Sequence, residues 1–162
     1  MPDSDIQQRI WTALEAQPVC MLSAIVAGEI STRPMSGHVD RENHRILFLA
    51  HRHGGKIEEA VRSGHVSIAI SREDRNFYAA IACEAAELED RDLLRRIWNP
   101  MASAWFPAGP DDPDAALLAL TPVSAEIWEG PSSSVVVAFK LATARILGRP
   151  AALGVNATVD MR

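Results

Sequence analysis

The 162-residue sequence contains little cysteine, little lysine and no long hydrophobic run. Its two cysteines, Cys20 and Cys83, are distant from each other and lie in apolar segments, which predicts buried free thiols in a reducing cytosol rather than a disulfide. No stretch of about 18 apolar residues occurs, so we expect no membrane span. The first residues, Met-Pro-Asp-Ser-Asp, lack the basic and apolar regions of an export signal. These absences together predict a cytoplasmic protein without membrane partners.

The charge balance is acidic overall but positive in one stretch. Aspartate and glutamate number 21 against 16 lysines and arginines, and the resulting net charge of -5 argues against a dedicated nucleic-acid binder. The two lysines are Lys56 and Lys140, and the other basic residues are arginines. All five histidines lie between residues 38 and 65, where basic residues outnumber acidic ones. We therefore expect the functional chemistry to begin in this stretch.

Apolar periodicity predicts a mostly extended chain with inserted helices. Helical spacing occurs at 4–16, 56–62 and 90–97, and extended segments occur at 19–26, 30–39, 45–50, 66–70, 76–83, 117–128 and 135–147. Six or seven strands without βαβ alternation favour a mainly β fold, an antiparallel β-barrel with appended helices. The segment 98–113, rich in tryptophan and proline, is predicted to be a fixed loop. We expect one domain over 1–147, followed by a tail over 148–162 that can be partly disordered.

A candidate anion site lies where the loop 51–55 leads into the predicted helix that begins at Lys56. The first amides of a helix lack intrahelical partners and carry partial positive charge, so a glycine-containing loop at this point can hold a phosphate. Arg33, in a neighbouring predicted strand, would add a second cation. Gly-Gly-Lys before a helix is common, however, and the Walker pattern is absent, so solvated surface charges are the alternative.

The sequence contains no familiar catalytic motif. His51 and His53 form an HxH pair without a third ligand at a recognisable spacing, which favours exposed loop histidines and no metal site. GxSxG, HExxH, CxxC and GxGxxG are all absent. A chain with a phosphate cradle but no evident nucleophile indicates chemistry supplied by a bound cofactor.

Several short strings along the chain have a recognisable order. They are Ser-Thr-Arg-Pro-Met at 31–35, Ile-Leu-Phe-Leu-Ala at 46–50, Lys-Ile-Glu-Glu at 56–59, His-Val-Ser-Ile-Ala-Ile at 65–70, Trp-Phe-Pro-x-Gly-x-Asp-Asp-Pro at 105–113 and Ala-Glu-x-Trp at 125–128. In this order they resemble the general stress protein branch of the pyridoxamine 5'-phosphate oxidase-like flavoproteins. The resemblance extends from about residue 5 to about residue 145. It implies an antiparallel split β-barrel that binds FMN and forms a homodimer, with two flavin sites at the subunit interface.

The resemblance implies that eleven residues bind the cofactor, while it leaves catalytic residues unknown. The eleven are Arg33, Pro34, Met35, Ser36, His38, Leu49, Ala50, Gly55, Lys56, Tyr78 and Trp128. Arg33, in the Arg-Pro-Met motif, and Lys56 would bind the flavin phosphate. Gly55 stands where the oxidases often have a second basic phosphate ligand.

The remaining positions surround the flavin ring and its ribityl chain. Met35 and Ser36 would line the ring through backbone atoms, and His38 occupies the place of a lysine near the ring. Leu49 with Ala50 would follow the ribityl chain. In the same resemblance, Tyr78 stands about where a glutamine reaches the flavin, and Trp128 would come from the partner subunit.

One departure from the family pattern narrows the predicted function. After Trp128 the chain continues Glu-Gly-Pro-Ser-Ser-Ser, without the Arg-x-His motif by which true pyridoxamine phosphate oxidases bind substrate. The sequence therefore predicts an FMN-dependent oxidoreductase of an unidentified small molecule rather than a vitamin B6 oxidase. The alternative is a non-catalytic module that binds or senses flavin, haem or deazaflavin.

Overall fold

One long strand, β6 (Ala115–Glu129), pairs with three other strands and organises the fold. The structure is a computed structural model and describes residues 3–53, 56–131, 134–148, 150 and 154–162. The other strands are β1 (Val19–Val26), β2 (Glu29–Asp40), β3 (Arg45–His51), β4 (His65–Arg72), β5 (Phe77–Leu88) and β7 (Val155–Asp160). The helices are α1 (Asp3–Ala16), α2 (Lys56–Ser63), α3 (Arg91–Ile97) and α4 (Ser134–Leu147).

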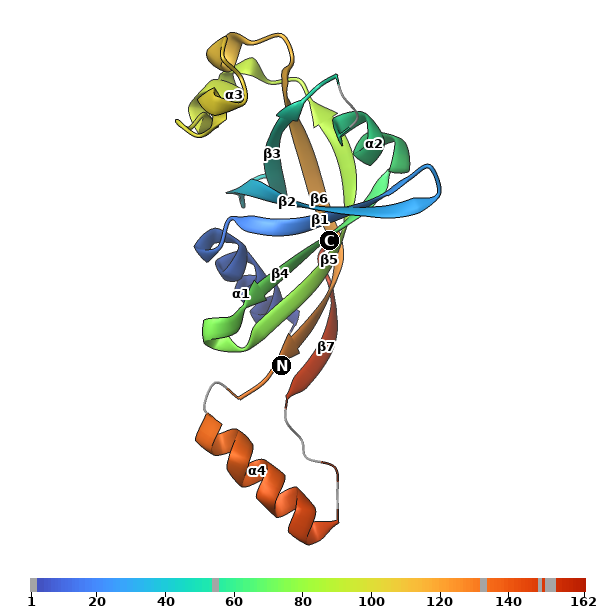
Figure 1. The fold of residues 1–162 in the computed structure, drawn as a ribbon, viewed down its shortest axis with the longest axis vertical. Coiled ribbons are helices and arrows are strands. Elements are labelled where there is room, and N and C mark those ends of the chain that lie inside the picture. The colour runs from blue at the N-terminus through green and yellow to red at the C-terminus, as the bar shows by residue number, and fades with distance from the viewer. Residues whose placement is uncertain (1–2, 54–55, 132–133, 149, 151–153) are drawn as a thin grey trace.

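The seven strands form one antiparallel sheet that closes on itself. Its order is β3-β2-β1-β4-β5-β6-β7, and β3 also pairs with the first part of β6, from Ile46 opposite Leu120 to His51 opposite Ala115. Six strands thus form a barrel, and β7 continues the sheet along the last part of β6 (Figure 1). The predicted mainly β, antiparallel split-barrel fold is confirmed.

Alternating strand residues divide the interior into two apolar clusters. The larger cluster fills the barrel with side chains such as Phe48, Ile68 and Ile81, and α1 adds Ile10 and other residues of its apolar face. The smaller cluster lies outside the barrel wall, where α3 and the loop after it cover β3 and β6; its largest members are Leu47, Leu93, Leu94, Phe106 and Leu117. Because β3 contributes to both clusters, its two faces are both buried.

Two predictions near the C-terminal end are wrong. Residues 135–147 are not extended but form α4. The valine run at its start suggests a strand, but the residues that follow it are mostly good helix formers, such as alanine, leucine, lysine and arginine. The predicted domain end at 147 comes too early, since β7 pairs antiparallel with β6 and buries Val159 and Met161 in the core. The folded unit therefore includes residues 155–161 of the segment that we expected to be a tail.

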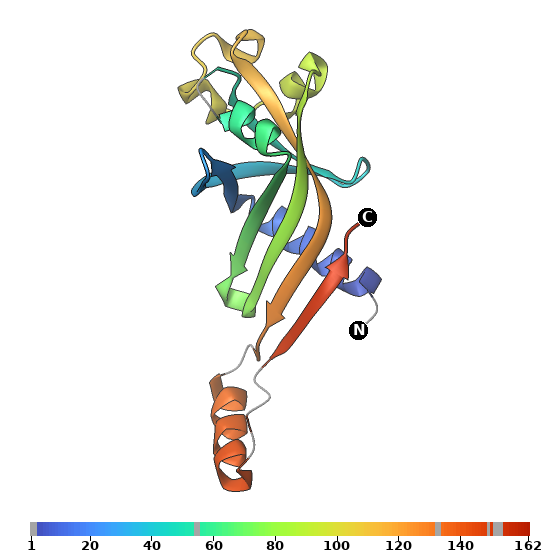
Figure 2. The ribbon, with the colours of Figure 1, turned by 90° about the vertical axis from the view of Figure 1, so that its right-hand side faces the viewer.

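Helix α4 lies away from the barrel, between the ends of β6 and β7, in both views (Figures 1 and 2). Across the described part of the chain, no helix combines the length and apolar character needed to cross a membrane.

Candidate functional site

The cation Arg33 lies beside helix α2, whose first residue is Lys56. Arg33 stands opposite the buried Leu22 in the register of β1 and β2, so its side chain is on the side of the strand that faces α2. Its Nη2 atom lies 2.9 Å from Oε2 of Glu59, one helical turn after Lys56, and 3.4 Å from Oγ of Ser31. The fold thus places the side chain of Arg33 against the helix whose first residue is Lys56. Gly55, the third residue predicted there, lies outside the described residues.

Strand β2 presents its motif residues to two opposite faces. Arg33 and Met35 are partly buried, and Met35 packs against the main core. Pro34, Ser36 and His38 alternate with them and are exposed on the other face. One continuous motif therefore supplies side chains to both sides of the barrel wall, which the string of letters does not reveal.

The two residues predicted to follow a ribityl chain also point in opposite directions. Ala50 is buried in the main core, at 5% exposure, whereas Leu49 packs against the smaller cluster and pairs with Leu117. With its side chain enclosed in the barrel, Ala50 can offer a ligand only its backbone.

Tyr78 and Trp128 lie directly opposite each other in the pairing of β5 with β6. Together with Val19 and Met21 of β1 they make up the exposed apolar side of the barrel wall, which we call the outer face. These four side chains, with small residues such as Ala80, line a cavity of about 430 Å³. The lining holds no acidic or basic side chain, so this cavity suits a flat, mainly apolar group.

Sequence reasoning missed the contribution of β1 to this cavity. Val19 and Met21 are exposed, whereas the alternating Cys20 and Leu22 are buried. Both sets are apolar, so the run 19–26 shows no alternation in its letters, and only the pairing with β2 and β4 decides which set faces outward. An apolar strand that leaves one face uncovered is the signal that could have indicated a binding surface.

The predicted residues therefore form two groups rather than one continuous site in a single chain. Arg33 and the start of α2 make up a cationic end, and Tyr78 with Trp128 make up an aromatic part on the outer face. The lining of the outer cavity includes the aromatic pair but not Arg33.

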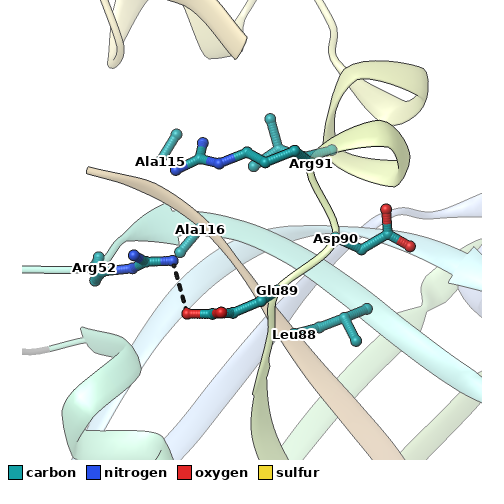
Figure 3. A pocket seen from close by; sticks show the side chains of 8 residues that line it. Arg52, Leu88, Glu89, Asp90, Arg91, Ala115 and Ala116 are labelled. Carbon is teal, nitrogen blue, oxygen red and sulfur yellow. Dashed lines mark ion pairs between the residues drawn. The ribbon is translucent and has the colours of Figure 1, made fainter. Parts of the chain in front are cut away.

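A second cavity, of about 290 Å³, lies where the end of β5 meets α3 and the start of β6 (Figure 3). Two arginines face it, and both are engaged by neighbouring groups. Arg52 lies 3.6 Å from a carboxylate oxygen of Glu89, and Arg91 donates to the backbone oxygens of Pro110 and Asp112. Through the bonds of Arg91, the start of α3 is attached to the loop that precedes β6.

The histidine pair at the end of β3 is bound to one carboxylate, Asp114. Its Oδ2 atom lies 2.8 Å from Nδ1 of His51, and the backbone N–H of His53 donates to its Oδ1 atom at 2.8 Å. These hydrogen bonds, first that from His53, hold the pKa of Asp114 below its usual value. The ring of His51 also packs on Phe106, with centroids 4.3 Å apart. The pair thus fastens the end of β3 to the start of β6.

Known proteins resemble this chain over most of its length. The sequence profile of the family described as "Pyridoxamine 5'-phosphate oxidase like" matches residues 5–151. The protein bli-3 of Neurospora crassa is 27% identical over 124 residues, which cover 72% of this chain and 57% of the fungal protein. This chain thus spans little more than half the length of that relative.

Solved structures agree with that match. One described as general stress protein 26, from a Jannaschia species, is 27% identical, with a TM-score of 0.74, and the alignment covers 97% of this chain and 99% of that one. Another, described as the general stress FMN/FAD binding protein of Xanthomonas citri, is 28% identical, with a TM-score of 0.70, over 80% of this chain and 92% of that one.

Proposed function

The chain belongs to the pyridoxamine 5'-phosphate oxidase-like family, and from this we propose that it binds a flavin, specifically FMN, through its terminal phosphate. The observation that carries the proposal is the placement of Arg33 beside the helix that begins at Lys56. A phosphate monoester is a dianion, and two cations at a helix N-terminus suit it better than they suit the singly charged linkages inside FAD. The description of the Xanthomonas citri relative as an FMN/FAD binding protein supports a flavin ligand.

We further propose that the flavin ring lies at the outer face and that a second copy of the chain completes the site. The outer face exposes Met21 at 42%, Tyr78 at 38% and Trp128 at 39%. Arg33, at the cationic end, does not line the cavity on this face. An apolar face of this kind is typical of an interface, and a two-fold pair would place the cationic end of one chain near the aromatic part of the other. The proposal is therefore a homodimer with two flavin sites.

The bound ring would supply the electron-transfer chemistry, and the chain would bind and orient it. The cation pair would fix the phosphate, while Tyr78 and Trp128 would pack against the ring and exclude water from one side. We propose oxidation or reduction of a small molecule as the activity. The second candidate, flavin binding without turnover, is favoured by one observation, namely that the residues lining the outer cavity include no carboxylate, imidazole, lysine or arginine side chain.

Titration with two flavins tests the phosphate assignment. Quenching of flavin fluorescence should give a dissociation constant for FMN that rises at least about 100-fold in the double variant Arg33→Ala/Lys56→Ala, because two charge-assisted contacts of about 1.5 to 3 kcal/mol each are removed. Riboflavin, which lacks the phosphate, should bind wild type and variant alike. Arg62→Ala removes an exposed cation from the same helix and is the matched control. Equal weakening of both flavins, or unchanged FMN binding, would contradict the assignment.

A reduction experiment separates the two candidate functions. The FMN-loaded protein is mixed with NADH or NADPH without oxygen, and the flavin absorbance is followed. Bleaching within seconds, reversed by air, would support an oxidoreductase. Stable absorbance with both donors would favour the binding module.

A further inference from the structure

Helix α4 is an apolar helix whose described large apolar side chains are mostly exposed. Over its 14 residues, charge is limited to Lys140 and Arg145. Large apolar side chains are exposed on several of its sides, Phe139 at 69% and Ile146 at 81%, with Leu141 at 49% and Val136 at 43%. Both views place the helix beyond the end of the barrel (Figures 1 and 2). A helix that is hydrophobic all round is ordinarily buried, so we expect another surface to cover α4.

The place of α4 in the chain links it to the outer face. The helix interrupts the hairpin of β6 and β7, whose last paired residues are Glu129 and Val155. Trp128, which lines the outer cavity, is the residue before Glu129. The segment that contains α4 therefore leaves the barrel directly beside the exposed apolar side chains of the outer face. The apolar surface of α4 and the outer face thus belong to one end of the molecule.

We propose that α4 is an arm that packs against a second copy of this chain. The inference rests on the pairing proposed above and adds the segment that clasps the pair. In a two-fold pair the interface is self-complementary, so each contact of an arm with the partner is made twice. Both exposed apolar surfaces, α4 and the outer face, are then covered by one association.

Charge supports the same partner. Helix α4 carries two cations and no acid, whereas the rest of the chain has 14 basic and 21 acidic residues. The first turn of α1 adds two exposed acids, Asp3 and Asp5, whereas Asp74 between β4 and β5 is already paired with Arg72. A second copy thus offers an acidic surface to a basic, apolar arm. An anionic bilayer would also attract α4, but it would leave the outer face of the barrel uncovered.

Sedimentation equilibrium of the full-length, FMN-loaded protein tests the proposal. Wild type should have twice the 17.6-kDa chain mass. The variant Phe139→Glu/Ile146→Glu, which changes two exposed residues, should raise the dimer dissociation constant at least 100-fold, while circular dichroism shows an intact fold. The matched control is Met101→Glu/Trp105→Glu, which makes the same change at two side chains that are 74% and 70% exposed and far from α4 in the chain; it should keep the wild-type mass.

Met21→Glu, on the outer face, distinguishes failure of the arm from failure of the pairing. If Met21→Glu dissociates the pair and the α4 variant does not, the pairing stands and the arm proposal is overturned. If wild type is a monomer at every concentration, both proposals fail. A chain in which residues 132–153 are replaced by Asn-Gly should weaken the pair as much as the α4 variant does, and a wild-type dissociation constant in this chain would also overturn the arm.

Flotation with phosphatidylglycerol-containing vesicles examines the bilayer as the other partner. Little binding by the wild-type dimer is expected. Strong vesicle binding that the α4 variant loses, while its mass in solution stays that of wild type, would assign α4 to a membrane instead.

Discussion

At the cationic end, the ion pair of Arg33 with Glu59 limits how strongly Arg33 can bind a phosphate. Nη2 of Arg33 is 2.9 Å from the Glu59 carboxylate, and both side chains are about a quarter exposed, at 24% and 27%. An incoming phosphate would meet the carboxylate as a like charge while it competes for the same guanidinium. Glu59 is thus expected to weaken phosphate binding.

Glu59→Gln should therefore tighten FMN binding about 3- to 10-fold, a modest effect because solvent screens a partly exposed pair. Riboflavin affinity should not change, since no phosphate is present to be repelled. Fluorescence titration with both flavins is the measurement. Weaker FMN binding in this variant would mean that Glu59 orients Arg33 for the phosphate rather than competing with it.

The thiols of Cys20 and Cys83 are made unreactive by burial. Burial raises the pKa of Cys20 to about 11 and that of Cys83 to about 12, and the two residues are 3% and 1% exposed. At pH 8 a thiol with such a pKa is ionised in only about one molecule in a thousand or fewer.

We expect the native protein to react with a disulfide reagent at pH 8 at least about 100-fold more slowly than a free cysteine, and both thiols to react promptly in denaturant. The release of the coloured thiol product follows the reaction. Rapid modification of either cysteine in the native state would show that its strand opens far more readily than a core strand should.

At the scale of single elements, β2 depends on a glycine for its fit against β3. A Cβ atom at Gly37 would lie 2.9 Å from the ring of Phe48 and 3.0 Å from Ile46, both of which are buried and cannot easily move. The backbone N–H of Gly37 also donates to Pro18 at 2.8 Å. The close packing of backbone on ring holds the exposed neighbours Ser36 and His38 in place.

Gly37→Ala should lower the free energy of unfolding by about 1 to 3 kcal/mol through overpacking, although alanine is otherwise the better strand residue. Urea denaturation gives the value, and Ser36→Ala, at an exposed position of the same strand, should change little. A stabilised Gly37→Ala variant would mean that Phe48 can rotate away.

The tie between β3 and β6 should make stability depend on pH through Asp114. Its folded pKa lies below the ordinary value of 3.8, so the folded state takes up this proton less readily than the unfolded state. The contribution of Asp114 is therefore present above the unfolded pKa and is lost as pH falls through the lower folded pKa.

Asp114→Asn should accordingly lower the unfolding temperature at about pH 6, and the difference from wild type should shrink toward about pH 2.5, because lowering the pH progressively protonates Asp114 in the wild type. Thermal unfolding followed by circular dichroism at the two pH values measures this. A difference that is the same at both would assign the loss to packing rather than to charge.

How far the elements could be predicted depended on how local their determinants are. Strands such as 45–50 and the helix at 56–62 were predictable because apolar spacing and neighbouring glycines decide them locally. Helix α4 was not, because valine favours strands and a segment apolar on all sides shows neither period clearly. Strand β7 depends on pairing with a distant part of the chain, which composition does not encode.

The candidate site likewise has one part that local sequence predicts and one part that it does not. The approach of Arg33 to the start of α2 was predictable, because the predicted strand that carries Arg33 neighbours the loop that leads into the predicted helix. The division of the β2 motif between two faces and the exposure of Val19 and Met21 required the pairing register of three strands. A one-residue change in register would exchange the two faces, so the letters alone could not decide them.

At the scale of the whole molecule, the proposed sites at an interface couple flavin binding to association. If the ring contacts both copies, FMN must favour the pair and the pair must favour FMN by the same factor. The outer face and its cavity are the surface on which both equilibria would depend.

Serial dilution of the FMN-loaded protein should therefore release flavin below the dimer dissociation constant, with recovery of FMN fluorescence. Met21→Glu should shift the release to higher protein concentration, whereas the Met101→Glu/Trp105→Glu control should not. Retention of FMN by a monomeric variant with wild-type affinity would place the whole flavin site within one chain.

The interrupted hairpin of β6 and β7 has an entropic consequence. Its strands pair up to Glu129 and Val155 as though joined by a short turn, yet residues 130–154 lie between them. Closing a loop of about 25 residues costs roughly 2 kcal/mol more than closing one of two residues. Burial of Val159 and Met161, and the hydrogen bond from Gln7 to the Asp160 backbone, offset that cost in a single chain. Without α4, the single chain would be more stable, and if α4 packs on a second copy as proposed, the pair would be weaker.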